Sequence, residues 1–430
     1  MDDAGRPTHG RTLAGNDRLN ALPDSAYAVR RLAVSLLLMT IGTGGMYVVV
    51  TVLPTVQSEF GVARAAASLP YALLLLGFGF GGILMGRLAD RRGVMLPSLI
   101  GAACVGLGFT LASQSPSIGW FAAAHCLFIG FLGSSASFAP LIADTSLWFV
   151  KHRGVAVAVC ATGNFLAGVL WPPVASHFVQ TSGWRATYLG IGVFCAVTMA
   201  ALALFLRGRP PTFAPAITMG KLARRASDRP FGMSATQATV LLCIAGLACC
   251  VAMAMPLVHI VALCADLGIS STRGAQMLSL MLALGIASRI VSGMLVDRIG
   301  GLWTLLIGST LQCLALLLFV PANSVYALYA VAALFGLFQG GIVPSYAIVV
   351  REYFSAKEAG TRVGTVLMFT LFGMALGGWM SGKIHDLTAS YDAAFLHGIA
   401  WNVVNIAIVL FLIRRVALQQ VALGKYQPIT

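Results

Sequence analysis

Charged residues are scarce in this sequence of 430 residues, and acidic residues are the scarcest. Asp, Glu, Lys and Arg together make up 10% of the chain, and only 14 residues are acidic. A water-soluble protein needs roughly 25% charged residues to cover its surface. With 58% hydrophobic residues and a mean hydropathy of +0.86, most of this surface must face something less polar than water.

Several motifs are also missing, and each absence removes a class of function. The nine cysteines form no C-x-x-C pair and no His cluster accompanies them, so neither a metal site nor a redox site is indicated. No G-x-x-x-x-G-K-[ST] segment is present, so ATP is not the expected energy source. No nucleophile–base pair can be identified. We therefore predict a protein that is not an enzyme and needs no cofactor.

Long apolar runs are abundant. A helix needs about 20 residues to cross a bilayer, and twelve runs with short connections reach that length. They cover residues 32–54, 67–86, 94–113, 118–143, 154–177, 185–206, 237–264, 274–296, 302–321, 324–350, 363–382 and 393–413. We therefore predict an all-α membrane protein with twelve transmembrane helices embedded in a lipid bilayer. The first thirty residues lack the apolar core of a cleavable signal peptide.

The net charge of +14 is distributed unevenly. If the N-terminus lies inside, 23 of the 28 Lys and Arg residues fall in cytoplasmic segments. The outer segments hold Arg64, Arg185, Arg273 and Lys383, and Arg289 lies within a span. This positive-inside pattern predicts cytoplasmic N- and C-termini in a plasma membrane, the inner membrane of a bacterium. The basic residues then contact anionic lipid, and no nucleic acid partner is expected.

The longest polar interruption separates two sets of six runs and carries six basic residues. It divides the chain into a cytoplasmic tail, a six-helix bundle, a cytoplasmic linker, a second six-helix bundle and a second tail. Their predicted limits are 1–31, 32–206, 207–236, 237–413 and 414–430.

A short motif occurs once in each half. GGILMGRLADRRG at 81–93 aligns without gaps on SRIVSGMLVDRIG at 288–300, with six identities in thirteen positions, which indicates a duplicated six-helix unit. Its glycines allow close helix approach, and its Asp can complement a neighbouring helix N-terminus. We predict that the motif is a conformational latch. The residues assigned to it are Gly86, Asp90, Arg91, Gly93, Gly293, Asp297 and Arg298.

The GRLADRRG segment, taken as the loop between the second and third runs, resembles the signature loop of the major facilitator superfamily. A weaker copy lies between the eighth and ninth runs, and Val94 departs from the family pattern, which usually continues with a basic residue. The resemblance covers essentially the whole chain. It implies two pseudo-symmetric six-helix bundles around a central cavity, rocker-switch alternating access and a functional monomer. The motif carries no information about the cargo.

One full charge stands out inside a predicted span. A charge at the centre of a bilayer costs ~2.5–3.5 kcal/mol, so such residues are functional candidates. Arg289 lies about fifteen residues into its run, and its counterpart in the repeat is Gly82. Because a guanidinium can donate two parallel hydrogen bonds to a carboxylate, we predict that Arg289 binds an organic anion.

Two regions resemble the monocarboxylate and oxalate–formate branch of the superfamily. They are FAPLIADTSLWFVKHRGVAVAVCATGNFLAGVL at 138–170, followed by GWR at 183–185, and PLVHIVALCADLGIS…LALGIASRIVSGMLVDRIGG, which ends at 301. In that branch an Arg in the eighth helix binds the substrate carboxylate, and Arg289 matches it. Oxalate exchangers also carry a Lys in the eleventh helix, which residues 363–382 lack, so a monocarboxylate is favoured. Animal monocarboxylate carriers place an Asp one turn before the Arg, where this chain has Gly285.

Further candidates are polar side chains in the remaining runs. Asp266 and His259 are candidates for proton coupling. An interface carboxylate is at least as good an interpretation of Asp266, and a lone membrane histidine is more often a packing residue. Each of the remaining candidates for substrate contact is also suited to joining neighbouring helices by hydrogen bonds. These candidates are Tyr47, Asn164, Gln339, Tyr346 and Asn402.

The sequence therefore predicts a secondary active transporter of a small organic anion, best matched by a monocarboxylate, working by proton symport or anion exchange. Two alternatives stay open. One is an exporter of a neutral or hydrophobic compound, with Arg289 as part of a gate. The other is a transporter-like ligand sensor, against which the short polar tails argue.

Overall fold

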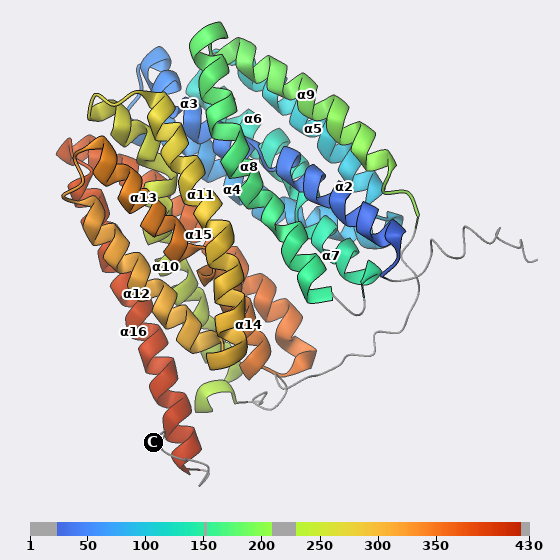
Figure 1. The fold of residues 1–430 in the computed structure, drawn as a ribbon, viewed down its shortest axis with the longest axis vertical. Helices are drawn as coiled ribbons and strands as arrows, with labels where there is room; N and C mark the ends of the chain where they lie inside the picture. The colour runs from blue at the N-terminus through green and yellow to red at the C-terminus, as the bar shows by residue number, and fades with distance from the viewer. Residues whose placement is uncertain (1–23, 150–152, 209–228, 423–430) are drawn as a thin grey trace, which may run out of the picture.

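A computed structural model of the chain describes residues 24–149, 153–208 and 229–422, and these residues are helical almost throughout (Figure 1). The apolar runs form helices because a chain in lipid must satisfy its backbone hydrogen bonds internally. In chain order the helices are α2 (Ala26–Gly42), α3 (Gly45–Phe60), α4 (Arg64–Arg92), α5 (Met95–Ser113), α6 (Ile118–Ala124), the π-helix η1 (His125–Gly133), the 3₁₀ turn η2 (Ser134–Ser137), α7 (Ala139–Trp148), α8 (Arg153–Ser182), α9 (Trp184–Leu204), the 3₁₀ turn η4 (Pro230–Gly232), α10 (Ala235–Asp266), α11 (Ser271–Ile299), α12 (Gly301–Phe319), α13 (Val325–Gln339), α14 (Ile342–Tyr353), α15 (Ala356–Thr388) and α16 (Asp392–Ala422).

Twelve candidate membrane spans are present, which confirms the all-α prediction with twelve transmembrane helices. Three spans are interrupted helices. The first consists of α2 and α3, the fourth of α6, η1, η2 and α7, and the tenth of α13 and α14. In the fourth and tenth spans a proline follows the interruption: Pro140 lies in the first turn of α7 and Pro344 in that of α14. Proline is tolerated there because the first turn of a helix needs no backbone N–H donor.

Some limits differ from the predicted ones. Helix α2 begins at Ala26, inside the predicted tail, because Arg31 is buried and pairs with Asp144 of α7 at 3.0 Å. Helix α4 continues through Arg92, so the GRLADRRG segment is helical and not the predicted loop; only Gly93, at φ 82°, lies outside the helix. Helix α16 extends to Ala422, past the predicted end of the last span. Most of the predicted linker, and residues 1–23 and 423–430 of the tails, lie outside the described residues.

The helices form two groups, which appear in blue to green and in yellow to red (Figure 1). Three helix pairs connect them: α4 with α15, α8 with α11, and α3 with α10. Helix α10 is buried on nearly every side, as expected for a helix that is apolar all round and lies at the centre. We call the end of the molecule where α9 finishes at Leu204 and α10 begins the connector end. The Arg64 end is the opposite one, where α4 begins and α15 ends.

Candidate functional site

Arg289, on α11, is held by an aromatic ring and backbone groups alone. Its guanidinium carbon lies 4.2 Å from the centroid of the Phe165 ring on α8. Its Nε donates to the Gly340 carbonyl at 3.3 Å and its Nη1 to the Ala161 carbonyl at 3.4 Å, both long for such bonds. Within the described part of the chain no carboxylate pairs with it. A guanidinium whose charge is not neutralised is suited to bind an anion.

The interruption of the tenth span supplies one of these carbonyls. Because α13 ends at Gln339, the carbonyls of its last turn have no partner within the helix. Helix α13 also approaches α11 closely: a Cβ added to Gly340 would lie 2.1 Å from the Gly285 carbonyl oxygen. The two glycines therefore allow the contact that brings the Gly340 carbonyl to Arg289.

Three of the predicted polar candidates lie in this region or beside it in the chain. Tyr47, on α3, is within electrostatic range of Arg289, and its ring lies against Gly168 of α8. Asn164 Oδ1 and Gln339 Nε2 are buried and have no hydrogen-bond partner among the described residues. Each precedes in the chain a residue that contacts Arg289. A buried polar atom without a partner is costly, so both amides are suited to bind a polar ligand. Substrate contact by these residues stays a prediction.

The structure does not bring Tyr346 and Asn402 to Arg289. Both are fully buried within the second group of helices. The Tyr346 hydroxyl donates to Asn405 Oδ1 at 2.7 Å, and Asn402 Nδ2 donates to the Ser309 carbonyl at 2.8 Å. These bonds join α14, α16 and α12, so the observed contacts of both residues are packing contacts. Their predicted contact with substrate gains no support from the geometry.

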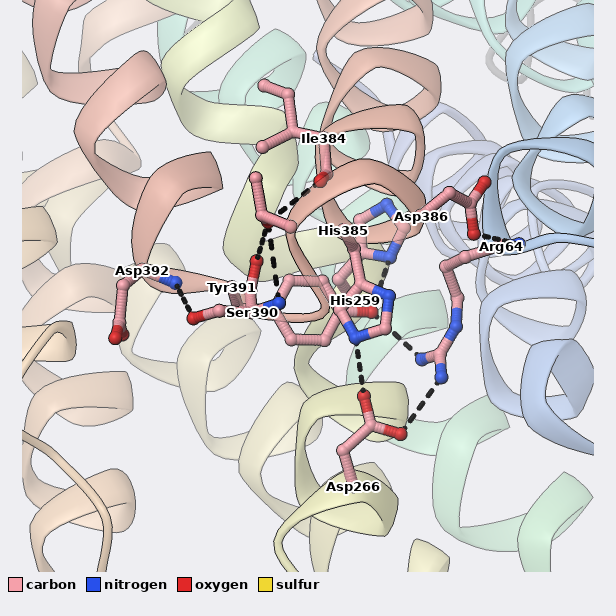
Figure 2. A network of polar contacts seen from close by, with 10 residues as sticks. Arg64, His259, Asp266, Ile384, His385, Asp386, Ser390, Tyr391 and Asp392 are labelled. Carbon is pink, nitrogen blue, oxygen red and sulfur yellow. Dashed lines mark hydrogen bonds and ion pairs between the residues drawn. The ribbon is translucent and has the colours of Figure 1, made fainter.

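A polar network joins the two groups of helices at the Arg64 end (Figure 2). Arg64 donates from Nη2 to Asp266 Oδ1 of α10 and from Nη1 to the Tyr391 hydroxyl, both at 2.9 Å. Asp386 of α15 accepts from the backbone N–H groups of Arg64 and Ala65 at 2.7 and 2.9 Å. A carboxylate in this position caps the N-terminus of α4 and complements its dipole. The cap comes from the other half of the molecule.

His259 occupies the buried side of this network. Its Nε2 lies 2.7 Å from the Gly378 carbonyl, and its Nδ1 lies 3.1 Å from the Tyr391 hydroxyl. A carbonyl can only accept, so Nε2 carries a proton. Burial raises the pKa of Tyr391 above its usual value, so the phenol keeps its proton and donates it to Nδ1. Both bonds therefore fit a neutral imidazole, and no excess proton is required.

Sequence analysis identified Asp266 and His259 but missed Arg64, Tyr391 and Asp386. The missed residues lie more than one hundred positions away in the chain from Asp266 or His259, so only the folded structure brings the five together. One signal was available. An arginine in the first turn of a helix is disfavoured by the helix dipole, which suggests that Arg64 has an acidic partner.

Comparison with known proteins supplies the family. A sequence model of the Major Facilitator Superfamily matches residues 32–249 and 240–425. The chain belongs to the Major Facilitator Superfamily. It is therefore a multi-pass secondary transporter of a small molecule and not an enzyme.

This superfamily member is similar in sequence or structure to several known transporters. MFS-type transporter opdF of Penicillium oxalicum is 27% identical over 70% of this chain and 69% of its own length. Monocarboxylate transporter 13 of Rattus norvegicus is 28% identical over 77% and 75%. The agnestins efflux protein of Paecilomyces divaricatus is 23% identical over 70% and 67%. Among solved structures, a bacterial homolog of the human lysosomal transporter Spinster, inward-facing and unoccupied, has a TM-score of 0.66 at 16% identity, covering 94% and 99%.

The repeated superfamily motif lies at the connector end with its charges in solvent. Asp90, Arg91, Asp297 and Arg298 are exposed, and in the described part of the chain none of them makes an ion pair. The predicted latch is therefore not engaged in this structure. Its function as a latch stays a prediction.

The motif glycines are not at close helix contacts in the described part of the chain. A Cβ at Gly86 or Gly293 would meet nothing within 4 Å, so close helix approach does not require glycine at these positions in this structure. Gly93 has a φ of 82°, a left-handed conformation in which other residues are strained. Its role is to end α4.

The two bundles of this transporter separate towards the connector end. Helices α4 and α15 touch near the Arg64 end, where a Cβ at Gly382 would lie 3.0 Å from Ala65. Towards the connector end a cavity of about 700 Å³ lies between them. Its lining includes Phe78, Phe80, Ser135, Phe138, Thr365 and Phe369. Arg31, Arg362 and Arg415 lie at this end, and each of their hydrogen bonds to described residues joins groups of the same half of the molecule.

Proposed function

We propose that this transporter carries a small organic monoanion, best matched by a monocarboxylate, by alternating access. The observation that supports the proposal is Arg289, a guanidinium inside a span that no described carboxylate neutralises. An anion bound there would cancel the charge. The free-energy cost of closing the site off from water would therefore be low only when the substrate is bound. Residues 363–382 offer no second cation for a dianion. The similarity to Monocarboxylate transporter 13 agrees with this cargo.

In this proposal Arg289 binds the carboxylate through two in-plane N–H groups. Tyr47 is within electrostatic range of the guanidinium, and Asn164 and Gln339 supply hydrogen bonds to the rest of the substrate. The aromatic and amide groups would fix its orientation, as in other small-molecule sites that combine apolar walls with a few polar groups.

We infer that the connector end faces the cytoplasm of a cell whose plasma membrane, or bacterial inner membrane, holds the protein. The support is the excess of Lys and Arg in the segments at that end. The cavity between α4 and α15 is then on the cytoplasmic half, and the Arg64 network closes the outer side.

Asp266 is the proposed site of proton coupling. Its side chain is 34% exposed, and its oxygens contact Arg64 of α4 and His385 of α15, at 2.9 and 3.2 Å. Tyr391 and the neutral His259 lie on the buried side of the same network. A proton on Asp266 removes the charge that holds Arg64, which would release the outer contact between the bundles. His259 is the other candidate from the sequence, but its two hydrogen bonds favour a packing role.

Uptake into proteoliposomes tests the cargo. Radiolabelled acids of two to five carbons are offered with and without an inward proton gradient to wild type, Arg289→Ala and the matched control Arg273→Ala, which removes an exposed cation from the same helix. We expect uptake of one acid by wild type and the control and none by Arg289→Ala. If no acid moves with any gradient or counter-anion, the anion proposal is wrong.

A second candidate is export of a neutral or hydrophobic compound. It is favoured by the aromatic lining of the cavity between α4 and α15, to which Arg289 does not contribute, and by the similarity to the agnestins efflux protein. Esterifying the carboxylate of a transported compound separates the two candidates. Transport unchanged by esterification supports the exporter, and transport lost on esterification supports the anion carrier.

A further inference from the structure

Phe165 fills a space on α11 that exists because residue 285 is a glycine. A Cβ at Gly285 would lie 2.5 Å from Phe165 Cε1 and 2.9 Å from Cδ1. On another side of Gly285, its carbonyl oxygen leaves no room for a side chain at Gly340, the residue that follows α13. Helix α11 is therefore packed between two partners at this turn, and the position of the Phe165 ring depends on the missing side chain.

The same ring is a direct contact of Arg289. Residues 285 and 289 are one turn apart and lie on the same face of α11. A ring seated on Gly285 therefore extends beneath the guanidinium, whose carbon is 4.2 Å from the ring centroid. That is well inside the ~6 Å range of a cation–π contact. The other two contacts of Arg289 are hydrogen bonds of 3.3 and 3.4 Å, at or beyond the long end of the normal range.

An aromatic face and a carboxylate hold a guanidinium in different ways. A carboxylate binds in the plane of the guanidinium, uses its N–H groups and cancels its charge. A ring binds one face of the plane and leaves both the N–H groups and the charge available. In the described part of the chain Nη2 of Arg289 has no hydrogen-bond acceptor. These contacts therefore hold the Arg289 side chain in place but do not neutralise its charge.

We propose that Phe165 is a positioning residue for the substrate site: it holds Arg289 by its aromatic face, so that the in-plane N–H groups not used by the two backbone carbonyls stay free for a singly charged anion. The proposal rests on the proposed function, because it takes the anion to bind at Arg289. Gly285 takes part indirectly, since any side chain there would displace the ring.

Fluorinated phenylalanines at position 165 test the proposal directly. Fluorine withdraws electron density from the ring and changes its size little, so a cation–π contact weakens stepwise from one to three fluorines. We expect KM for the transported acid to rise stepwise by about 2- to 30-fold, the range that corresponds to such contacts, with Vmax unchanged. A KM that is constant across the series would overturn the proposal. Phe165→Tyr keeps the aromatic face, so its KM should equal that of wild type.

A double-mutant cycle tests the role of Gly285. Gly285→Ala alone should raise KM, because it displaces the ring. In a Phe165→Ala background the same change should add no further increase, since the space is already empty. If Gly285→Ala raises KM by the same factor in wild type and in the Phe165→Ala background, Gly285 does not act through Phe165. Gly190→Ala, at a position with nothing within 4 Å, is the matched control and should leave KM unchanged.

The outcomes also separate this inference from the proposed function. If wild type binds and transports none of the acids, the proposed function fails and the inference fails with it. If wild type transports an acid and loses transport in Arg289→Ala, but fluorination has no effect, the function stands and Phe165 is a packing residue.

Discussion

Two guanidinium groups inside this protein are held in opposite ways. Arg64 has a carboxylate at 2.9 Å and a phenol at 2.9 Å, so its charge is matched within the protein. Arg289 has an aromatic face and two backbone carbonyls, so its charge is not matched. Because leaving a charge unpaired in a low-dielectric region is costly, the first arrangement suits a structural contact and the second suits a ligand site.

Arg289→Lys is the most direct test at this scale. Lysine keeps the charge but replaces the planar pair of donors with a point charge, so at least one charge-assisted hydrogen bond of about 1.5–3 kcal/mol is lost. We expect KM for the transported acid to rise by at least about tenfold in initial-rate uptake. Arg273→Lys is the control. Equal KM values for Arg289→Lys and wild type would contradict recognition by two parallel hydrogen bonds.

Tyr346→Phe should affect stability and leave affinity unchanged. Without the hydroxyl, the buried Asn405 Oδ1 loses its donor, at a cost of about 1–3 kcal/mol. We expect a lower Tm of the purified protein with an unchanged KM. The opposite result, a raised KM with an unchanged Tm, would return Tyr346 to the substrate site.

The different outcomes for Arg289 and Tyr346 mark the limit of sequence analysis for single residues. A charge in an apolar run is conspicuous in the sequence because burying it is expensive. A tyrosine or asparagine is cheaper to bury and occurs on either face of a helix. Which face turns to the other bundle depends on how the helices pack. The sequence therefore predicts the candidates, and the fold decides that Tyr47 lies near Arg289 while Tyr346 and Asn402 do not.

Interrupted helices are the characteristic elements of this fold. The tenth span stops at Gln339 and restarts at Ile342, and the carbonyl of Gly340 in the gap reaches Arg289. In membrane proteins such gaps are tolerated where protein or a cavity satisfies the freed groups. The interruption and the charge on α11 therefore belong to one arrangement.

Gly340→Ala tests that arrangement. The new Cβ would lie 2.1 Å from the Gly285 carbonyl oxygen, which is backbone and cannot rotate away. We expect α13 and α11 to move apart, with a loss of about 1–3 kcal/mol of stability and a raised KM, because Arg289 loses a hydrogen bond. Thermal unfolding and uptake are measured together, with Gly190→Ala as the control. A Gly340→Ala variant with wild-type Tm and KM would show that the close contact is not needed.

The membrane spans were predictable because the hydropathy of a segment follows its contact with the bilayer. Hydropathy does not report where a helix ends, and some of the predicted helix limits were wrong for that reason. Backbone hydrogen bonding does not stop at the membrane surface, so α4 stays helical through the polar residues up to Arg92. The interruption at Gly340 was not predicted either. Which carbonyl the gap frees depends on the packing of α11.

The whole molecule consists of two bundles held together most firmly at the Arg64 end. Arg64→Gln removes the ion pair with Asp266, which is worth about 1 kcal/mol for a partly exposed pair, or about fivefold in population. We expect spin labels at Ser58→Cys and Leu387→Cys, on opposite bundles at that end, to show a larger fraction of long distances. Arg185→Gln, whose partner Glu59 is in its own bundle, is the control. Identical distance distributions would rule out this contact as a closure.

Asp266→Asn should make transport insensitive to acid on the Arg64 side. A proton on the Asp266 carboxylate would weaken its contacts with both Arg64 and His385. In the Asn variant both effects disappear. We expect the proton gradient to stop driving uptake while exchange of labelled for unlabelled acid continues. Gradient-driven uptake by Asp266→Asn would exclude Asp266 as the coupling site.

The cap that Asp386 places on α4 gives the closed Arg64 end an energetic preference of its own. When the bundles part there, two backbone N–H groups of α4 lose their carboxylate, and water becomes their substitute. An N-terminal cap is typically worth about 1 kcal/mol. Opening at the Arg64 end would therefore leave the N-terminus of α4 less stable, and α4 would regain its cap only when that end closes again.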